Sequence, residues 1–291
     1  MKYLKKYLPY ILVLVLFLSV FGIWYKIYAE DNKNTDYLTV AFLDIGQGDA
    51  IFIEAPNGKQ MLIDGGPDWK ILERLAEVMP FGDKSIDVIL ATHADMDHIG
   101  GLPFVLDDYK ITNIIENGII SETTIYKDYQ KEILKNKVNK IIARRDMRII
   151  LDKEKNIYFD ILFPDKDTLE LESNDGSIVG KLIYGEKSFM LTGDATIYTE
   201  NQIQWNENPK ILKSEVLKLG HHGSKTSSSI LWLEDVDPEI AIISVDKNNR
   251  YGHPHQEVLD RLNSLNIPYL TTYEEGSIIF KTDGVELIHI K

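Results

Sequence analysis

The chain contains no cysteine among its 291 residues. Disulfide bonds and cysteine-ligated zinc sites are therefore excluded. The absence leaves the compartment open, because 44% hydrophobic residues are enough for a large core without covalent cross-links. The sequence also has no internal repeat and no low-complexity tract. By length it forms one large domain or two small ones.

Positive charge is also scarce. The formal net charge is −13, and the first 30 residues contribute +3 to it, so the remainder carries −16. A surface this acidic is unfavourable for nonspecific binding of nucleic acid, which depends on Lys and Arg displacing counterions from phosphates. Any nucleic-acid hypothesis has to overcome this negative charge.

One apolar run stands at the N-terminus. Leu8 to Tyr25 is 18 residues without a charge, and at about 1.5 Å per residue it nearly crosses a hydrocarbon core of about 30 Å. Three lysines precede the run, and acidic residues dominate after it, which predicts a cytoplasmic N-terminus and an extracytoplasmic remainder. We therefore expect a single-pass protein of the cell membrane.

A signal peptide cleaved after Ala29, giving a secreted protein, is the alternative. The run exceeds the usual length of about 7–15 residues, and Ile27-Tyr28-Ala29 is not a small-x-small site, so an uncleaved anchor is favoured. A buried core helix would also be apolar, but this run is apolar all round and lies at the extreme N-terminus. The expected organisation is an anchor at 1–30, a polar linker at 31–36 and one domain at 37–291.

Short strands and helices alternate through that domain. Strands are expected at 38–43, 50–54, 60–63, 86–90, 111–116, 157–163, 177–184, 187–191, 215–219, 239–245 and 277–280. Helices are expected at 71–79, 122–137, 196–206, 227–234 and 255–265. This order fits an α/β fold of two mixed sheets with helices outside.

The segment from His93 to Gly101 carries the strongest functional signal. It follows the apolar strand 86–90 and places His93, Asp95, Asp97 and His98 within six positions. His93 and Asp95 alternate on an extended segment, so both side chains can point the same way. Buried carboxylates are costly unless they are paired or bind a metal. The segment predicts a divalent metal site, with up to two ions.

Three later loops add residues of the same types. Asp194 ends an apolar strand, where it could bridge two metals, although it could also cap a helix before Ile197. His221 and His222 stand between glycines after another strand, with a solvated loop as the alternative. The segment 251–255 contains His253, but Gly-His-Pro-His can simply open the helix at Gln256.

Together these motifs resemble the metallo-β-lactamase superfamily, whose signature is His-x-His-x-Asp-His. They are most similar to the metallohydrolase domain of ComEC-type competence DNA-uptake proteins. The matching segments are FLDIGQGDAIFIE (42–54), LIDGG (62–66), THADMDHIGG (92–101), NDGSIV (174–179), FMLTGDA (189–195), KLGHHGSKTSS (218–228) and YGHPH (251–255). The multi-span channel of ComEC is absent, and one N-terminal helix stands in its place.

The resemblance implies an αβ/βα sandwich with metal at the sheet edge. Its metal ligands would be His93, Asp95, Asp97, His98, Asp194 and His221. Asp95 stands where the broader superfamily has its second His, and no His occurs between His98 and His221. Ser177 occupies the region of the missing imidazole. An oxygen-rich first position shifts the preference from Zn²⁺ toward Mn²⁺ or Mg²⁺, with one firmly held and one weakly held ion.

A metal lowers the pKa of bound water to about 7, so a metal-bound hydroxide is the expected nucleophile. Asp97 and His253 are the expected catalytic residues, and the His253 imidazole is expected to titrate near neutrality, as a proton donor requires. Contacts with substrate are expected from His222, Ser224, Lys225, Thr226 and Ser177.

The first hypothesis is an extracytoplasmic phosphodiesterase, more specifically a nuclease, that acts on DNA or RNA. The second hypothesis is a hydrolase of a small phosphodiester or other ester at the cell envelope. The charge of −16 favours it, because a small substrate is repelled less than a long polyanion. A third is a DNA-binding or scaffold component of uptake machinery with little or no catalysis. The third would use the +5 segment 127–148, although a solvated helix face explains that segment more simply.

Overall fold

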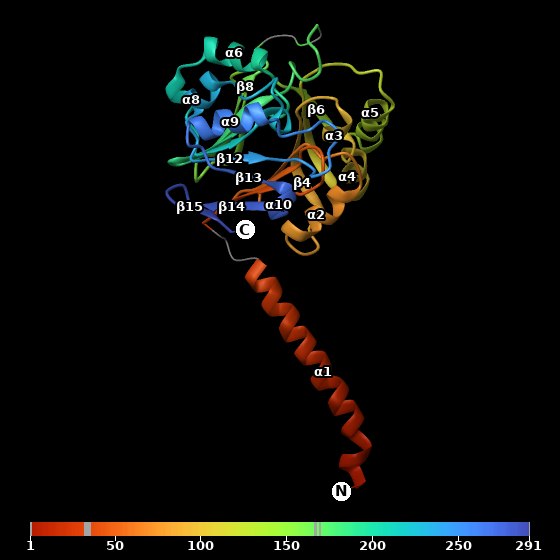
Figure 1. The fold of residues 1–291 in the computed structure, drawn as a ribbon. Coiled ribbons are helices and arrows are strands. Elements are labelled where there is room, and N and C mark those ends of the chain that lie inside the picture. Colours follow the sequence, from red (N-terminus) through yellow and green to blue (C-terminus); the bar gives the residue numbers. More distant parts are fainter. Residues whose placement is uncertain (1, 32–35, 166–167, 169, 291) are drawn as a thin grey trace.

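The domain consists of two mixed β-sheets packed face to face in a computed structural model that describes residues 2–31, 36–165, 168 and 170–290 (Figure 1). The first sheet has eight strands, in the spatial order β15 (Leu287–His289), β14 (Ile278–Thr282), β1 (Leu38–Phe42), β2 (Ile51–Glu54), β3 (Gln60–Ile63), β4 (Ser85–Ala91), β5 (Lys110–Glu116) and β6 (Asn139–Ile142). The second has seven, in the order β13 (Tyr269–Thr271), β12 (Ile240–Ile243), β11 (Val216–Lys218), β10 (Lys187–Leu191), β9 (Val179–Tyr184), β8 (Ile157–Phe163) and β7 (Arg148–Asp152).

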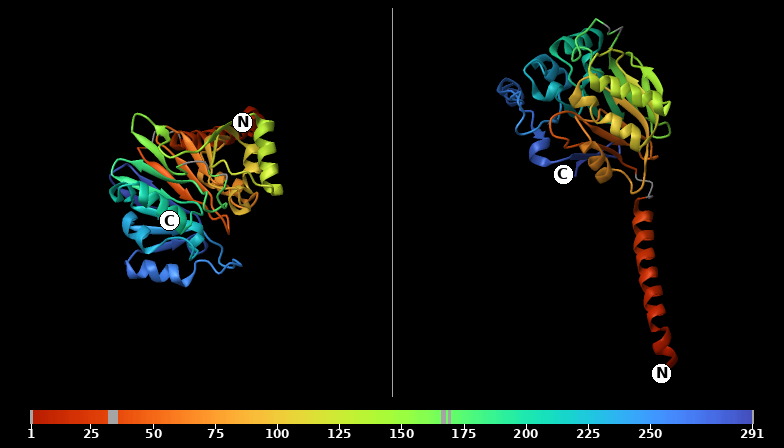
Figure 2. Two further views of the ribbon diagram at one scale, coloured as in Figure 1. Left: turned by 90° about the horizontal axis from the view of Figure 1, so that it is seen from above. Right: turned by 90° about the vertical axis from the view of Figure 1, so that its right-hand side faces the viewer.

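Helices cover the outer face of each sheet (Figures 1 and 2). Those on the first sheet are α2 (Lys70–Val78), α3 (Met96–Ile99), α4 (Leu102–Asp108) and α5 (Thr124–Asn136). Those on the second are α6 (Ile197–Asn206), α7 (Pro209–Leu212), α8 (Ile230–Val236) and α9 (Gln256–Ser264), while the short η1 (Gly220–Gly223) and α10 (Thr272–Glu275) belong to loops at strand ends.

Three apolar clusters hold these layers together. The central cluster lies between the two sheets and includes Phe42 and Phe280 from one and Phe159 and Phe189 from the other. A second cluster packs the first sheet against its helices, and a third does the same for the second sheet. The order helix, sheet, sheet, helix confirms the expected αβ/βα sandwich.

One half of each sheet is parallel, out to the edge strands β6 and β13, and this positions the functional residues. β3, β4 and β5 run parallel in the first sheet, and β10, β11 and β12 run parallel in the second. The carboxyl ends of parallel strands meet at one edge of a sheet, which is where ligands bind in α/β folds. Here the two edges face each other, so loops from both sheets enclose one site.

Four strands were missing from the sequence-based expectation: β6, β7, β13 and β15. β6, β13 and β15 have exposed or half-buried residues and lie toward the ends of their sheets. An edge strand buries less apolar surface than a central one, so its sequence carries less periodic signal.

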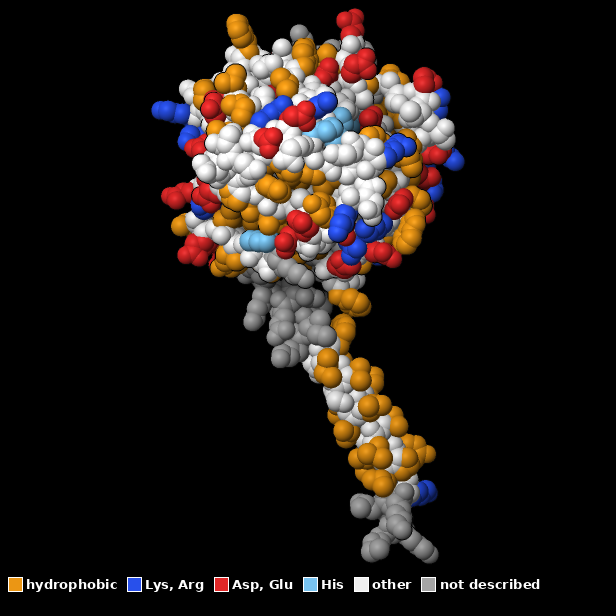
Figure 3. Space-filling model, in the orientation of Figure 1, with side chains coloured by type: hydrophobic (Ala, Val, Ile, Leu, Met, Phe, Trp, Pro, Cys, Tyr) orange, Lys and Arg blue, Asp and Glu red, His pale blue; other side chains and the backbone are white. Residues whose placement is uncertain are grey.

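The N-terminal helix α1 runs from Lys2 to Asp31. Its segment Lys6–Tyr25 has a mean hydropathy of 2.2 and is long and apolar enough to cross a membrane, and none of that segment is buried in the protein. Figure 3 shows it as an almost purely apolar rod outside the domain. The alternative of a buried core helix is therefore removed. Residues 32–35 of the expected linker lie outside the described residues, so its bounds stay a prediction.

Candidate metal centre

The site is built from the loops that follow four strands. Asp64 follows β3, His93 follows β4, Asp194 follows β10, and the paired histidines 221 and 222 follow β11. Asp97 and His98 belong to α3, one turn beyond His93. These acidic and imidazole side chains converge at the carboxyl ends of the parallel strands, although more than a hundred residues separate the first from the last in the sequence.

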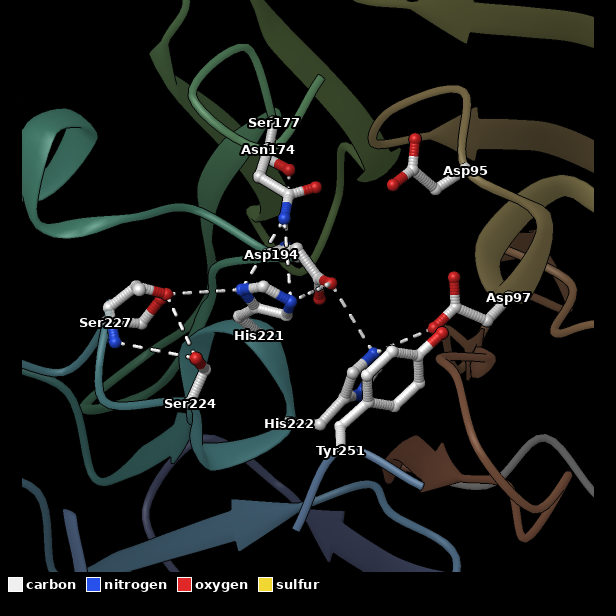
Figure 4. Close-up of polar contacts among 12 residues, drawn as sticks. Asp95, Asp97, Asn174, Ser177, Asp194, His221, His222, Ser224, Ser227 and Tyr251 are labelled. Carbon is white, nitrogen blue, oxygen red and sulfur yellow. Dashed lines mark hydrogen bonds and ion pairs between the residues drawn. The ribbon is translucent and has the colours of Figure 1, made fainter. Parts of the chain in front are cut away.

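Asp194 lies at the centre. One carboxylate oxygen, Oδ1, is 3.2 Å from His98 Nε2. The other, Oδ2, is 3.4 Å from His222 Nε2, 3.8 Å from His221 Nε2 and 4.0 Å from His93 Nε2. Figure 4 shows Asp194 between His221 and His222, with Asp97 beyond His222. This carboxylate is therefore in reach of every imidazole expected to bind metal.

The orientation of His98 is set by a buried carboxylate. Its Nδ1 lies 2.8 Å from Asp64 Oδ2, and a carboxylate can only accept, so Nδ1 carries the hydrogen. Thr92 donates to the same oxygen through its hydroxyl at 2.7 Å, so this hydroxyl is left to accept from His93 Nδ1 at 3.0 Å. Both imidazoles thus keep an Nε2 lone pair toward Asp194. Such carboxylate–imidazole pairs are typical of metal ligands.

His222 is fixed in the same tautomer by a backbone carbonyl. Its Nδ1 donates to the carbonyl oxygen of Ser244 at 2.9 Å, and its Nε2 lies 3.3 Å from Asp97 Oδ2. His221 and His222 both adopt left-handed backbone conformations, with φ of 49° and 55°. Non-glycine residues with such values cost of order 1–3 kcal/mol and concentrate at functional sites. The strain turns the fully buried His222 inward and leaves His221 partly exposed.

Several buried polar atoms of this site lack a hydrogen-bond partner within the part of the chain that the structure describes. They include Nε2 of His93, His98 and His222 and Oδ1 of Asp194. Buried polar groups are rarely left unsatisfied. Groups of three ligand atoms within 4.8 Å of one another occur in His93–His98–Asp194 and Asp97–His98–His222. A site lined with converging, unpartnered imidazole and carboxylate atoms fits a divalent metal.

The charges of the site favour the same conclusion. Burial alone would raise the pKa of Asp194, but His222 and His98 hold it well below the usual range. Burial would lower the pKa of His222, yet Asp194 and Asp49 raise it to about 9. The carboxylates therefore stabilise positive charge among the imidazoles. A bound cation satisfies the same carboxylates while the imidazoles stay neutral as ligands.

A buried ion pair lies behind the ligands, and sequence reasoning missed it. Lys218, the last residue of β11, is fully buried and its Nζ lies 2.5 Å from Asp49 Oδ2. Asp49 in turn lies 3.5 Å from His222 Nδ1. The signal was a charged residue next to apolar strand residues, Ala50-Ile51-Phe52 after Asp49 and Val216-Leu217 before Lys218. Asp64 was overlooked in the same way, although it directly follows a strand.

The loop that carries Asp49 also packs on Asp97. The backbone N–H of Asp49 donates to the carbonyl oxygen of Asp97 at 3.1 Å. Gly48, with φ of +127°, lies against that carbonyl so closely that a Cβ atom would overlap it. Only glycine fits this position, so the Gly48–Asp49 turn supports Asp97 from behind.

The expected first-position ligand Asp95 is more open than the others. Its side chain is 46% exposed, its Oδ2 lies 3.8 Å from His93 Nε2, and its Oδ1 accepts from Ser173 at 2.6 Å. Ser177 is fully buried in the region of the missing imidazole, with its hydroxyl against His93 Nδ1 at 3.2 Å and Asp194 N. Burial gives Ser177 no exposed surface for a substrate.

The loop after His222 holds the other expected substrate contacts. Ser224 is buried and its hydroxyl lies 3.0 Å from that of Thr226. Thr226 is exposed and lies 3.3 Å from His221 Nδ1, and Lys225 is also exposed. Thr226 and Lys225 are therefore the accessible members of this group beside the site.

His253 lies next to both paired histidines, with ring centroids 5.3 Å from His221 and 6.4 Å from His222. Burial and these neighbouring imidazoles lower the pKa of His253 to about 4. This corrects the expectation of an imidazole titrating near neutrality, because surrounding positive charge disfavours a further proton. At neutral pH His253 is a neutral hydrogen-bonding group.

The basic segment 127–148 is not one surface. It spans α5, β6 and the first residue of β7. Most of its cations are neutralised by acidic partners outside or within the segment: the ion pairs are Lys127–Glu122, Lys135–Asp107, Lys140–Glu116, Arg145–Glu207 and Arg148–Asp160. The pairing favours the simpler interpretation of a solvated, charge-balanced face.

The chain is similar in sequence to several known proteins. A family model described as "Metallo-beta-lactamase superfamily" matches residues 43–245. ComE operon protein 3 of Bacillus subtilis (strain 168) is 35% identical over 260 residues, which cover 83% of this chain and 33% of that protein. Recombination protein 2 of Haemophilus influenzae (strain ATCC 51907 / DSM 11121 / KW20 / Rd) is 32% identical over 241 residues, covering 81% of this chain and 28% of that protein.

The chain therefore spans 33% and 28% of the length of these two relatives. Among solved structures, the metallo-beta-lactamase fold protein YhfI from Bacillus subtilis matches with a TM-score of 0.52 at 12% identity, covering 80% of this chain and 95% of that one. At 12% identity this match shows a shared fold and no more.

Proposed function

The chain belongs to the metallo-beta-lactamase superfamily, as its motifs predicted, and from this membership we propose that it is a metal-dependent phosphodiesterase of ComEC type. Its fold is that of a metallohydrolase and its relatives include Competence protein ComA of Neisseria gonorrhoeae.

We assign metal binding to two halves that share Asp194. The half around α3 comprises Asp97, His98 and His222, and the other comprises His93, Asp95 and His221. A divalent ion held there supplies Lewis-acid activation of water and of a phosphoryl oxygen. Zn²⁺ and Mn²⁺ are both compatible with imidazole and carboxylate ligands.

The chain's own groups complete the proposed site. Asp64 and the Ser244 carbonyl hold two imidazoles with Nε2 directed inward. Lys225 and Thr226 lie at the exposed side, where an ammonium and a hydroxyl suit a phosphate. His253, neutral at pH 7, acts by donating a hydrogen bond to the substrate, in place of the proton-donor role expected from the sequence.

The observation that carries the proposal is the set of unpartnered buried atoms around Asp194. To test it, we would purify the full chain in detergent, remove metal with a chelator, and restore Mn²⁺, Mg²⁺ or Zn²⁺ in turn. Cleavage of labelled single-stranded DNA, RNA and bis-p-nitrophenyl phosphate is then followed. We expect metal-dependent cleavage that Asp97→Ala and His222→Ala both abolish.

The matched control is Asp108→Asn, which changes an exposed carboxylate paired with Lys84 away from the site. It should leave cleavage unchanged. Full activity in Asp97→Ala and His222→Ala would refute the assignment. His221→Ala belongs in the same series, because the sequence pointed to His221 as the metal ligand. A larger loss of activity in His221→Ala than in His222→Ala would exchange the positions assigned to these two histidines in the two halves of the site.

A second candidate is a hydrolase of a small phosphodiester at the cell envelope. The net charge of −16 after residue 30 and the charge-balanced segment 127–148 favour a short substrate over a long polyanion. If the protein cleaves bis-p-nitrophenyl phosphate but cleaves neither DNA nor RNA, the result selects this candidate. A third, non-catalytic DNA-binding role requires salt-sensitive DNA affinity in a chain that binds no metal.

We further propose that α1 anchors the enzyme with its catalytic domain outside the cytoplasm, on the basis of its apolar segment and the lysines before it. The absence of cysteine makes a direct test available. A single cysteine at exposed Thr124 should react with a membrane-impermeant maleimide in intact cells, whereas one at Lys2 should not. The reverse pattern contradicts the orientation, and recovery of the domain in the medium indicates a cleaved signal peptide.

A further inference from the structure

A cleft larger than the metal site opens beside it. The cavity over the metal ligands has a volume of about 140 Å³ and is lined by Asp194, Asp97, His221 and His222 among others. The neighbouring cleft has about 640 Å³, within the range of about 300–1,000 Å³ typical of ligand sites. Both are lined by Gln47, Asp97 and Tyr251, so they form one continuous depression.

Tyr251 separates the two parts. Its ring is stacked on the His253 ring, with centroids 5.7 Å apart and an angle of 22° between the planes. The residue is 49% exposed, and Figure 4 shows its ring in front of His222 with its hydroxyl toward Asp97. The His253 ring and the Arg250 guanidinium each cover part of the Tyr251 ring, and a flat ligand can stack on the part that stays exposed.

Arg250 stands on the same cleft wall. One guanidinium nitrogen donates to the Tyr251 hydroxyl at 2.7 Å, and its Cζ lies 4.9 Å from the centre of the Tyr251 ring. Guanidinium groups carry five N–H donors in a fork that matches phosphate. A guanidinium at this position also repels a quaternary ammonium, which argues against a choline headgroup as the ligand.

The loop that carries these two residues is braced from within. Asn249 Oδ1 accepts from the backbone N–H groups of Tyr251 at 3.1 Å and His253 at 2.9 Å. Its Nδ2 donates to the carbonyl oxygens of Asp246 at 2.8 Å and His253 at 2.7 Å. Arg250 and Tyr251 are thus presented by a pre-organised turn, which lowers the entropy lost on binding.

The junction between the two parts contains an unused donor. Gln47 Nε2 is buried and has no hydrogen-bond partner among the described residues. Since Gln47 lines both cavities, a ligand passing from one to the other meets this amide. Buried donors normally have a hydrogen-bond acceptor, and an oxygen atom of a bound ligand would serve as the acceptor for this amide.

The charge of the cleft limits the length of that ligand. Its lining includes the cations Lys70 and Arg250 and the carboxylates Asp68, Asp97 and Asp246. No net positive track leads along it, so it offers no electrostatic gain to a long polyanion. A single stacking ring and a single exposed guanidinium suit one nucleoside unit with one further phosphate.

We propose that this cleft is the subsite for the nucleoside next to the hydrolysed phosphodiester, with Tyr251 stacking on its base, Arg250 bonding the next phosphate and Gln47 donating at the junction. The inference rests on the proposed function, since it names the substrate of that same site. It assigns specificity to the side of the scissile bond that points away from His221. Recognition of one unit also explains how an acidic domain accepts a nucleic acid.

Two esters with the same leaving group test the subsite in the full chain in detergent, loaded with Mn²⁺. They are thymidine 5′-(p-nitrophenyl phosphate) and methyl p-nitrophenyl phosphate, and the measured quantity is the ratio of their kcat/KM values. Wild type should prefer the nucleoside ester. Base–aromatic stacking is worth about 1–3 kcal/mol, so Tyr251→Ala should lower the ratio by about 5- to 150-fold.

Tyr251→Phe keeps the ring and should retain most of the ratio, which keeps the test informative where Tyr251→Ala fails to fold. Arg250→Ala should raise KM for a thymidine dinucleotide ester more than for the mononucleotide ester. Trp205→Ala changes an aromatic side chain that is 89% exposed on α6 and should keep the wild-type ratio. An unchanged ratio in Tyr251→Ala, or equal kcat/KM for both esters in wild type, overturns the subsite.

These results are distinct from a failure of the proposed function. If metal-loaded wild type cleaves neither ester, phosphodiesterase activity itself is refuted. If it cleaves both equally, the activity stands and the nucleoside subsite falls.

Discussion

The buried ion pair between Lys218 and Asp49 has a measurable consequence for stability. Lys218 Nζ lies 2.5 Å from Asp49 Oδ2, 3.1 Å from the carbonyl oxygen of Gly193 and 4.0 Å from Asp194 Oδ1. At 2.5 Å and an effective dielectric constant of about 20, the Coulomb attraction of the pair is about 7 kcal/mol, which the desolvation of both ions largely offsets. Removing only the cation leaves Asp49 buried without that partner.

Lys218→Met keeps the length of the side chain and removes its charge. We expect it to lower the free energy of unfolding of the metal-free full chain by about 3–5 kcal/mol, measured by urea unfolding in detergent. Adding Asp49→Asn to Lys218→Met should cost less than the sum of the single changes, by about 0.5–3 kcal/mol, because the two groups interact directly. Stabilisation by Mn²⁺ should grow in Lys218→Met, since a nearby positive charge has been removed.

Lys213→Met is the matched control, because Lys213 pairs with Asp237 at 2.7 Å while both side chains are well over half exposed. Exposed pairs contribute about 0–1 kcal/mol. If Lys218→Met lowers the free energy of unfolding no more than Lys213→Met does, or if the effects of the two changes in the double variant are additive, the ion pair does not stabilise the site.

Asp64→Asn removes the carboxylate that orients a ligand imidazole and should weaken divalent-metal affinity by about 10- to 100-fold in a calorimetric titration, whereas unchanged affinity rules out that role. Gly48→Ala should displace Asp97 and lower both metal affinity and the melting temperature, while Gly58→Ala, with φ of +80° but no atom near its Cβ position, reports backbone strain alone and should affect metal affinity little. Burial raises the pKa of Glu200 above 4.5, so the folded chain holds this proton to higher pH than the unfolded chain and loses stability as pH rises through that window. Glu200→Gln should abolish that decline of thermal stability as the pH rises above 4.5, and parallel curves for the two proteins would contradict it.

The candidate metal ligands could be picked out from the sequence because their chemistry leaves a pattern at strand ends. An apolar strand followed by His or Asp is unusual, and it occurs for His93, Asp194 and His221. The sequence did not reveal which of the two adjacent histidines turns inward. That depends on two consecutive left-handed residues, and propensity does not anticipate such a backbone at His222.

The supporting residues were not predictable for a different reason. Asp49 and Lys218 come from different sheets, and each alone is a charged residue in an apolar segment. Only the packing of the two sheets brings them together and makes their burial tolerable. The missed strands follow the same logic, since β15 and β6 form through pairing with a neighbour and bury little of their own surface.

The two halves of the site differ in how their imidazoles are supported. His98 Nδ1 donates to the carboxylate of Asp64, which raises the basicity of its Nε2, whereas His93 Nδ1 lies against the hydroxyl groups of Thr92 and Ser177. The carboxylates differ too: the Asp97 side chain is 28% exposed and the Asp95 side chain 46%. A ligand that is both more basic and less solvated binds a cation more firmly. The expectation of one firmly held and one weakly held ion therefore has a physical basis, and we propose the firm position at Asp97, His98 and His222, beside the cleft that Tyr251 and Arg250 line.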